Sequence, residues 1–99
     1  MDPVTAAVVA AISTGALAGA KDSASQPMKD AYGGLKSLIS RKYRGVDVSG
    51  VERRPNSKAK QESLAEDLED AGACGDSELA EAAKAVLAGH RVLDRQSAR

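Results

Sequence analysis

Few side chains in this chain of 99 residues have the type and spacing needed for chemistry. Cys74, flanked by Gly72-Ala73 and Gly75, is expected to be a loop thiol without a catalytic role. His90 is expected to be a partly buried side chain or a cation at a helix end. A lone cysteine excludes an internal disulfide, and one cysteine with one histidine excludes a Cys/His zinc site. We therefore expect neither a metal nor another cofactor.

Carboxylates are the other candidates for chemistry. Pairs of them could imitate a hydrolytic dyad, but no pocket is indicated near them, and a solvated acidic face is the preferred interpretation. No Ser/His/Asp grouping offers a credible nucleophile. A phosphate-binding loop of the form GxxxxGK[ST] also fails, because Gly15, Gly19 and Lys21 have the wrong spacing. The sequence thus predicts a protein that is not an enzyme. The crowded acids are Glu62, Glu66, Asp67, Glu69 and Asp70.

The composition predicts one small domain with a thin core. Hydrophobic residues make up 42% of the chain, yet only two residues are aromatic and neither Phe nor Trp occurs. Such a core must be built from Ala, Val, Leu and Ile. Fourteen basic residues balance fourteen acidic ones, which does not fit an overall basic nucleic-acid-binding protein.

The hydrophobicity is concentrated near the N-terminus, where residues 3–20 include no charged side chain. As a helix these residues would be about 27 Å long, close to the roughly 30 Å hydrocarbon thickness of a bilayer. Asp2 suits the N-cap of this helix, and Pro3 suits its first position. A secretory signal peptide is disfavoured because Met1-Asp2-Pro3, at the start of the chain, includes an acid and no base.

The uncharged segment predicts a helix without a polar face. Such a helix lies either at the centre of a bundle or in a membrane, and burial at rest followed by release on activation would combine the two. One row of small residues includes a GxxxG spacing, which lets helix backbones approach closely. The row is Ala7, Ala11, Gly15 and Gly19. The residues predicted to enter a membrane are Val4, Val8, Val9, Ile12, Gly15, Leu17 and Gly19.

The rest of the chain also has helical periodicity. A second helix is expected from a cap at Ser25 to about Tyr43, with Gly33-Gly34 marking a close backbone contact or a kink. Residues 45–57 predict a linker with one helical turn, and a third helix is expected over 58–71, capped by Asn56 or Ser57. Asp76 should cap a fourth helix, and residues 91–99 should fray.

We therefore expect an all-α fold: a small bundle of four to five helices with a central or N-terminal hydrophobic helix. Residues 1–93 would form a single domain. Residues 94–99 would be a flexible end that leads to a signalling motif in a longer protein.

Charges are segregated along the chain. Residues 21–60 hold ten bases and four acids, whereas residues 61–82 hold eight acids and no base. These blocks could simply neutralise each other within the bundle. Alternatively, the acidic helix could act as a clasp that masks bases able to bind lipid headgroups, each worth about 1 kcal/mol at an anionic membrane surface. The bases are Arg41, Lys42, Arg44, Arg53 and Arg54, joined by Lys58 and Lys60.

The residues also suggest a family. The run ALAGAKDSASQPMKDAYGGLKSLISRKY, most specifically residues 21–43, resembles bacterial cell-death domains called Bell domains. These are similar to fungal HeLo domains and to the four-helix bundle of the necroptosis executioner pseudokinase. The resemblance covers nearly the whole chain. It implies a membrane-active effector, cytoplasmic at rest, that moves to the cell membrane after homo-oligomerisation and is triggered by an NLR-type receptor through an amyloid motif. No such motif is present in residues 91–99.

Two functions follow as alternatives. One is a pore-forming or permeabilising effector of regulated cell death in bacterial immunity, with membrane lipid, most readily anionic, as its partner. The other is a death-fold-like adaptor whose charged faces recruit a protein and whose first helix is only a core element. The uncharged N-terminal segment favours the effector, because an adaptor helix needs only one buried face.

Overall fold

The computed structural model describes residues 2–17 and 26–97, with the side chains of residues 90–97 left out of the description. Five helices lie in this part of the chain and no strand does. They are α1 (Pro3–Leu17), α2 (Gln26–Lys42), α3 (Ser49–Arg53), α4 (Lys58–Asp70) and α5 (Ser77–Ser97). The expected all-α bundle is confirmed, and α3 is the single turn predicted within the linker.

The helices α1, α4 and α5 begin where a side chain accepts a hydrogen bond from one of their first free N–H groups. Asp2 accepts a hydrogen bond from the backbone of Thr5 at 3.0 Å, Ser57 from Lys60 at 3.3 Å, and Asp76 from Leu79 at 3.1 Å. Each acceptor stands three residues before its donor, which is the N-cap geometry. Gly72 ends the turn after α4 with φ of +83°, a conformation that side chains disfavour.

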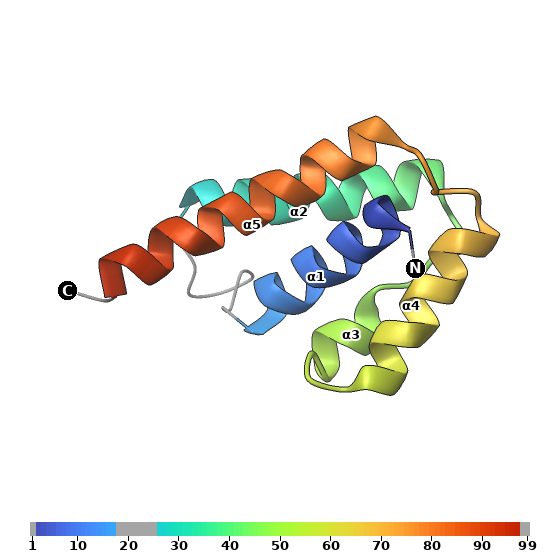
Figure 1. The fold of residues 1–99 in the computed structure, drawn as a ribbon, viewed down its shortest axis with the longest axis horizontal. Helices are drawn as coiled ribbons and strands as arrows, with labels where there is room; N and C mark the ends of the chain where they lie inside the picture. The colour runs from blue at the N-terminus through green and yellow to red at the C-terminus, as the bar shows by residue number, and fades with distance from the viewer. Residues whose placement is uncertain (1, 18–25, 98–99) are drawn as a thin grey trace.

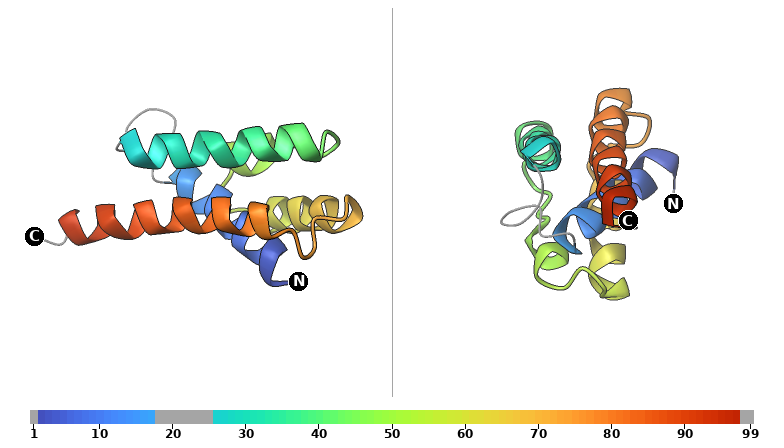
Figure 2. Two further views of the ribbon diagram at one scale, coloured as in Figure 1. Left: turned by 90° about the horizontal axis from the view of Figure 1, so that it is seen from above. Right: turned by 90° about the vertical axis from the view of Figure 1, so that its left-hand side faces the viewer.

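α1 is the central helix of the bundle. Its backbone packs against each of the other four helices, whereas among the described helices the α2 backbone packs otherwise on α5 alone and the α3 backbone on α4 alone. Figure 1 shows α1 between these two pairs, and Figure 2 shows α2 and α5 running antiparallel. Val8, Ala11 and Ile12 are fully buried. Of the two placements open to this helix, the structure shows the one inside the bundle.

α2 confirms the predicted apolar stripe but corrects its glycines. Met28, Tyr32 and Leu35 are buried as expected, with Leu38 and Ile39 continuing the row. Gly33 and Gly34 instead face open space, and the helix continues through them without a break. They lie on the solvent side of the stripe, so none of the described residues approaches them.

The close approach occurs at Gly15 instead. A Cβ atom at Gly15 would lie 2.4 Å from Tyr32 Cδ1 and 2.5 Å from Cε1. One side of the Tyr32 ring therefore lies against Gly15 of α1, in space that any side chain would occupy. Gly15, a member of the small-residue row, thus allows close packing between two helices of the same chain.

α5 is longer than expected. The sequence predicted fraying from Arg91, but the helix continues to Ser97. No glycine or proline follows Gly89, so the sequence holds no residue that would stop the helix there.

Replacing Gly15 with Ala should destabilise the bundle, whereas the same change at Gly33 or Gly34 should stabilise it. Alanine gains about 1 kcal/mol over glycine in a helix, but at Gly15 the overlap with the Tyr32 ring adds an overpacking cost of about 1–3 kcal/mol. Urea unfolding measures both changes. A Gly15→Ala protein as stable as Gly33→Ala would contradict the contact.

Candidate functional site

The residues predicted to enter a membrane lie mostly inside the bundle. Val8, Val9 and Ile12 are buried, Val4 is half-buried, and Gly15 lies under the Tyr32 ring. Leu17 is 58% exposed at the C-terminal end of α1. Gly19 lies outside the described residues. Over residues 2–17 and 26–97, no helix combines the length and the apolar character needed to cross a bilayer.

Two interaction centres surround α1. The first joins α2 to α3 beside Gly15: the Tyr32 hydroxyl donates to Glu52 at 2.7 Å, and Lys36 Nζ lies 2.9 Å from the same carboxylate. Lys36 Nζ also stands 5.7 Å from the centre of the Tyr32 ring, within cation–π range. Burial, together with the Glu52 carboxylate, raises the pKa of the Tyr32 hydroxyl. The ring that covers Gly15 is therefore held at its outer end by a charged acceptor.

The second centre is at the start of α1. Asp2 accepts hydrogen bonds from the backbone and hydroxyl of Thr5, and Cys74 Sγ lies 3.1 Å from Asp2 Oδ1. The Thr5 hydroxyl, its backbone N–H and the Cys74 thiol hold the pKa of Asp2 below its usual range, and contact with Asp2 raises the pKa of Cys74. A raised pKa disfavours the reactive thiolate. The sequence indicated the cap but not the Cys74 contact, because 72 residues separate the two.

The predicted clasp is not formed in the described residues. The basic set and the acidic set of α4 are all exposed, and no ion pair joins one set to the other there. Within the described residues, the backbones of α2 and α4 do not pack against each other. Lys42 pairs instead with Asp76 at 3.2 Å and Glu78 at 2.6 Å. The antiparallel arrangement of α2 and α5 brings these groups together.

Asp76 links the end of α2 to the start of α5. Besides capping α5, it accepts hydrogen bonds from the Tyr43 hydroxyl and from Lys42 Nζ. The Tyr43 hydroxyl, the Leu79 N–H and Lys42 lower the pKa of Asp76 from its ordinary 3.8. Sequence reasoning found the cap alone, since the contact with Tyr43 and Lys42 depends on the packing of α2 against α5.

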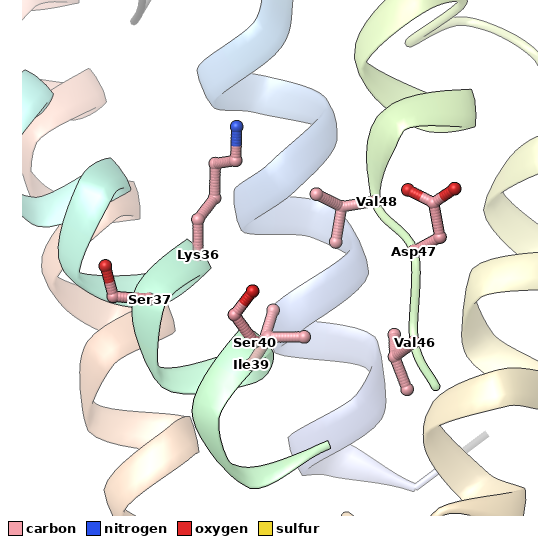
Figure 3. A pocket seen from close by; sticks show the side chains of 7 residues that line it. All are labelled: Lys36, Ser37, Ile39, Ser40, Val46, Asp47 and Val48. Atoms are coloured by element: carbon pink, nitrogen blue, oxygen red, sulfur yellow. The ribbon is translucent and has the colours of Figure 1, made fainter. Parts of the chain in front are cut away.

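Two open cavities have distinct chemistry. One, of about 390 Å³, lies between α2 and the connection that follows it; Figure 3 shows Lys36, Ser37, Ile39 and Ser40 on one side and Val46, Asp47 and Val48 on the other. Its cation, Lys36, is already paired with Glu52. The other, of about 490 Å³, is lined by Gly50, Arg53, Arg54 and Lys60. In the described part of the chain, no three His, Cys, Asp or Glu side chains converge to hold a metal.

Comparison with known proteins identifies the family. The sequence model of the Het-E N-terminal domain matches residues 1–97. The chain belongs to the Het-E N-terminal domain family. This family is related to the HeLo-like cell-death domains of fungi, so the broader part of the resemblance is confirmed, while the narrower likeness to bacterial Bell domains stays a prediction. No curated protein and no solved structure matches the chain.

The Asp76 contacts predict a dependence of stability on pH. Because folding lowers the pKa of Asp76, its contribution is present above the ordinary value of 3.8 and is lost as the pH falls through the lowered value. Asp76→Asn keeps a capping side chain but removes the charge. The variant should be less stable than the parent at neutral pH, with a difference that shrinks in acid.

Urea unfolding at a series of pH values measures this difference. Tyr43→Phe removes the largest cause of the lowered pKa and should give a smaller effect over the same pH range. A difference between Asp76→Asn and the parent that stays constant down to the acid limit would contradict the assignment.

Proposed function

We propose that this domain is an effector of regulated cell death that acts on membranes through α1. In this proposal α1 is kept inside the bundle at rest, homo-oligomerisation releases it, and its apolar side chains then enter lipid. The relationship to HeLo-like cell-death domains supports the cell-death role. The observation that carries the membrane role is that the central helix, residues 3–17, has no charged side chain on any face.

The way α1 is held supports its release. Ser13 Oγ is buried with no hydrogen-bond partner in the described part of the chain, and an unsatisfied buried hydroxyl costs about 1–3 kcal/mol. Release of α1 removes this cost where it exposes Ser13 to water or to the polar headgroup region. Ala6, Ala10 and Leu17 are exposed along α1, so one narrow strip of the helix reaches the surface before any release.

The remaining parts of the proposal concern partners and place. Exposed bases such as Arg41 and Arg44 favour anionic lipid as the target, because each contributes about 1 kcal/mol near an anionic surface. An NLR-type receptor would act through a motif outside this chain. The domain would be cytoplasmic at rest and would relocate to the cell membrane, and it would carry no enzymatic activity.

Leu17→Asp should abolish membrane damage without unfolding the domain. Leu17 is 58% exposed, so the bundle does not need it. A carboxylate costs about 2.5–3.5 kcal/mol at the centre of a bilayer and less towards its edge, where the C-terminal end of α1 would lie. A loss of about tenfold in leakage is therefore expected. Release of a dye from vesicles with anionic lipid measures the effect. Ala59→Asp is the matched control, because it adds the same charge at an exposed position of α4. Full leakage by Leu17→Asp would exclude insertion of α1.

A disulfide that ties α1 to the bundle should block the activity reversibly. Cys74 Sγ lies 3.1 Å from Asp2 Oδ1, so Asp2→Cys places two thiols in reach of each other. Leakage and cell killing should be absent in the oxidised variant and return with a reductant. The double variant Asp2→Cys, Cys74→Ser loses the same N-cap but cannot form the disulfide, so its leakage should be the same with and without reductant. Equal leakage by the oxidised and reduced forms would contradict release of α1.

The adaptor remains the second candidate because α4 presents an exposed acidic face. Glu62, Glu66 and Asp67 are exposed, as are Glu69 and Asp70, and none forms an ion pair within the described residues. An adaptor would recruit a basic partner through this face while α1 stays in the core. It would cause neither leakage nor cell death when residues 1–99 are expressed alone, so the same assays separate the two functions.

A further inference from the structure

The cavity between α3 and the first turn of α4 gathers cationic side chains around an open space. Arg53 and Arg54 come from the end of α3, Lys60 comes from α4, and Gly50 completes the lining of the cavity of about 490 Å³. Figure 1 shows these two helices side by side, joined by a short turn. Residues from two elements thus share one concave surface.

These three cations differ from the paired lysines elsewhere in the protein. Lys36 and Lys42 each form an ion pair, whereas Arg53, Arg54 and Lys60 form none within the part of the chain that the structure describes. The charge of Arg53 does influence Asp47. Hydrogen bonds from Ser49 are the main cause of the lowered pKa of Asp47, and the positive charge of Arg53 lowers it further. Like charges around one cavity repel, and an anion between them would relieve that repulsion.

The backbone beneath the cations is well anchored. Val51 is buried on the inner side of α3, and the Arg54 N–H donates to the Gly50 carbonyl at 3.1 Å. The Ser57 N–H donates to the Arg54 carbonyl at 3.0 Å, and Ser57 in turn caps α4 at Lys60. These bonds fix the turn that sets the distance between α3 and the first turn of α4.

Gly50 positions the third cation. A Cβ atom at Gly50 would stand 3.4 Å from Lys60 Cδ, so the methylene stem of Lys60 lies against the α3 backbone. Lys60 lines the same cavity as Arg53 and Arg54. Contact of a lysine stem with a surface while its charged end reaches solvent is ordinary behaviour for this side chain.

We propose that this cavity is a binding site for a phosphate group, carried either by a lipid headgroup or by a small soluble molecule. Guanidinium groups match phosphate oxygens through paired N–H donors, and an ammonium group adds a compact charge. The open volume leaves room for the group that bears the phosphate. The lipid form of this ligand rests on the proposed membrane function, whereas the phosphate site itself does not.

Titration with inorganic phosphate tests the site, with the amide resonances of the folded protein followed by NMR at constant ionic strength. We expect saturable shifts confined to residues 50–60. Arg54→Gln and Lys60→Gln should each weaken binding by about tenfold or more, since a hydrogen bond to a charged group is worth at least that factor. Lys58→Gln is the matched control, because Lys58 lies in the same turn, is exposed and does not line the cavity.

Small, unsaturated shifts spread over all exposed lysines, or equal effects of Lys58→Gln and Lys60→Gln, would overturn the site. Thermal melts of each variant show that the fold is retained. A second arm measures binding to phosphatidylcholine vesicles with and without phosphatidic acid, which has an exposed phosphomonoester.

The two arms separate the source of the phosphate. Vesicle binding that requires phosphatidic acid and is lost in Lys60→Gln identifies a lipid headgroup. Phosphate binding without vesicle binding supports the site with a soluble ligand, and leakage by the parent protein then decides the membrane function separately.

Discussion

The structure depends on the packing of α1, because this helix lies between the α2–α5 pair and the α3–α4 pair and joins them. The backbones of the two pairs do not pack on each other directly in the described residues. Between the pairs, the Glu52 carboxylate reaches Tyr32 and Lys36, so a small polar contact supplements a large apolar one. Removing α1 would expose the inner faces of both pairs at once. Loss of this helix from its place is therefore coupled to the whole domain rather than to one neighbour.

The scarcity of aromatic residues makes this arrangement possible. With no Phe or Trp in the chain, the core is built from small and aliphatic side chains, and α1 comes close enough to α2 for Gly15 to lie under an aromatic ring. Tyr32 supplies the bulk that the rest of the core lacks. Its hydroxyl reaches the edge of the core and donates a hydrogen bond to Glu52. The ring is therefore held both by its contact with Gly15 and by this hydrogen bond.

Local signals in the sequence predicted much of the fold. The caps at Asp2 and Asp76 and the apolar stripe of α2 depend on neighbours within a few residues and were predicted correctly. The cap of α4 was predicted at Asn56 or Ser57, and the structure shows Ser57. The site was harder to predict. Contacts of a glycine with another helix, or of Lys42 with an acid, depend on how helices distant in sequence cross. The prediction of a close contact or a kink at Gly33 and Gly34 was wrong for this reason. Net charge in blocks showed that opposite charges exist, but packing decides which of them meet.

The order of the helices has a consequence during synthesis. α1 is made first, yet its most extensive partner is α5, which begins at Ser77. Until α5 has been synthesised, the nascent chain carries an uncharged helix that lacks its main packing partner. Contacts between residues so distant in sequence form late in folding. Chaperones or a nearby membrane can engage the segment during that interval. The uncharged helix α1 is thus synthesised well before the helix that covers most of it.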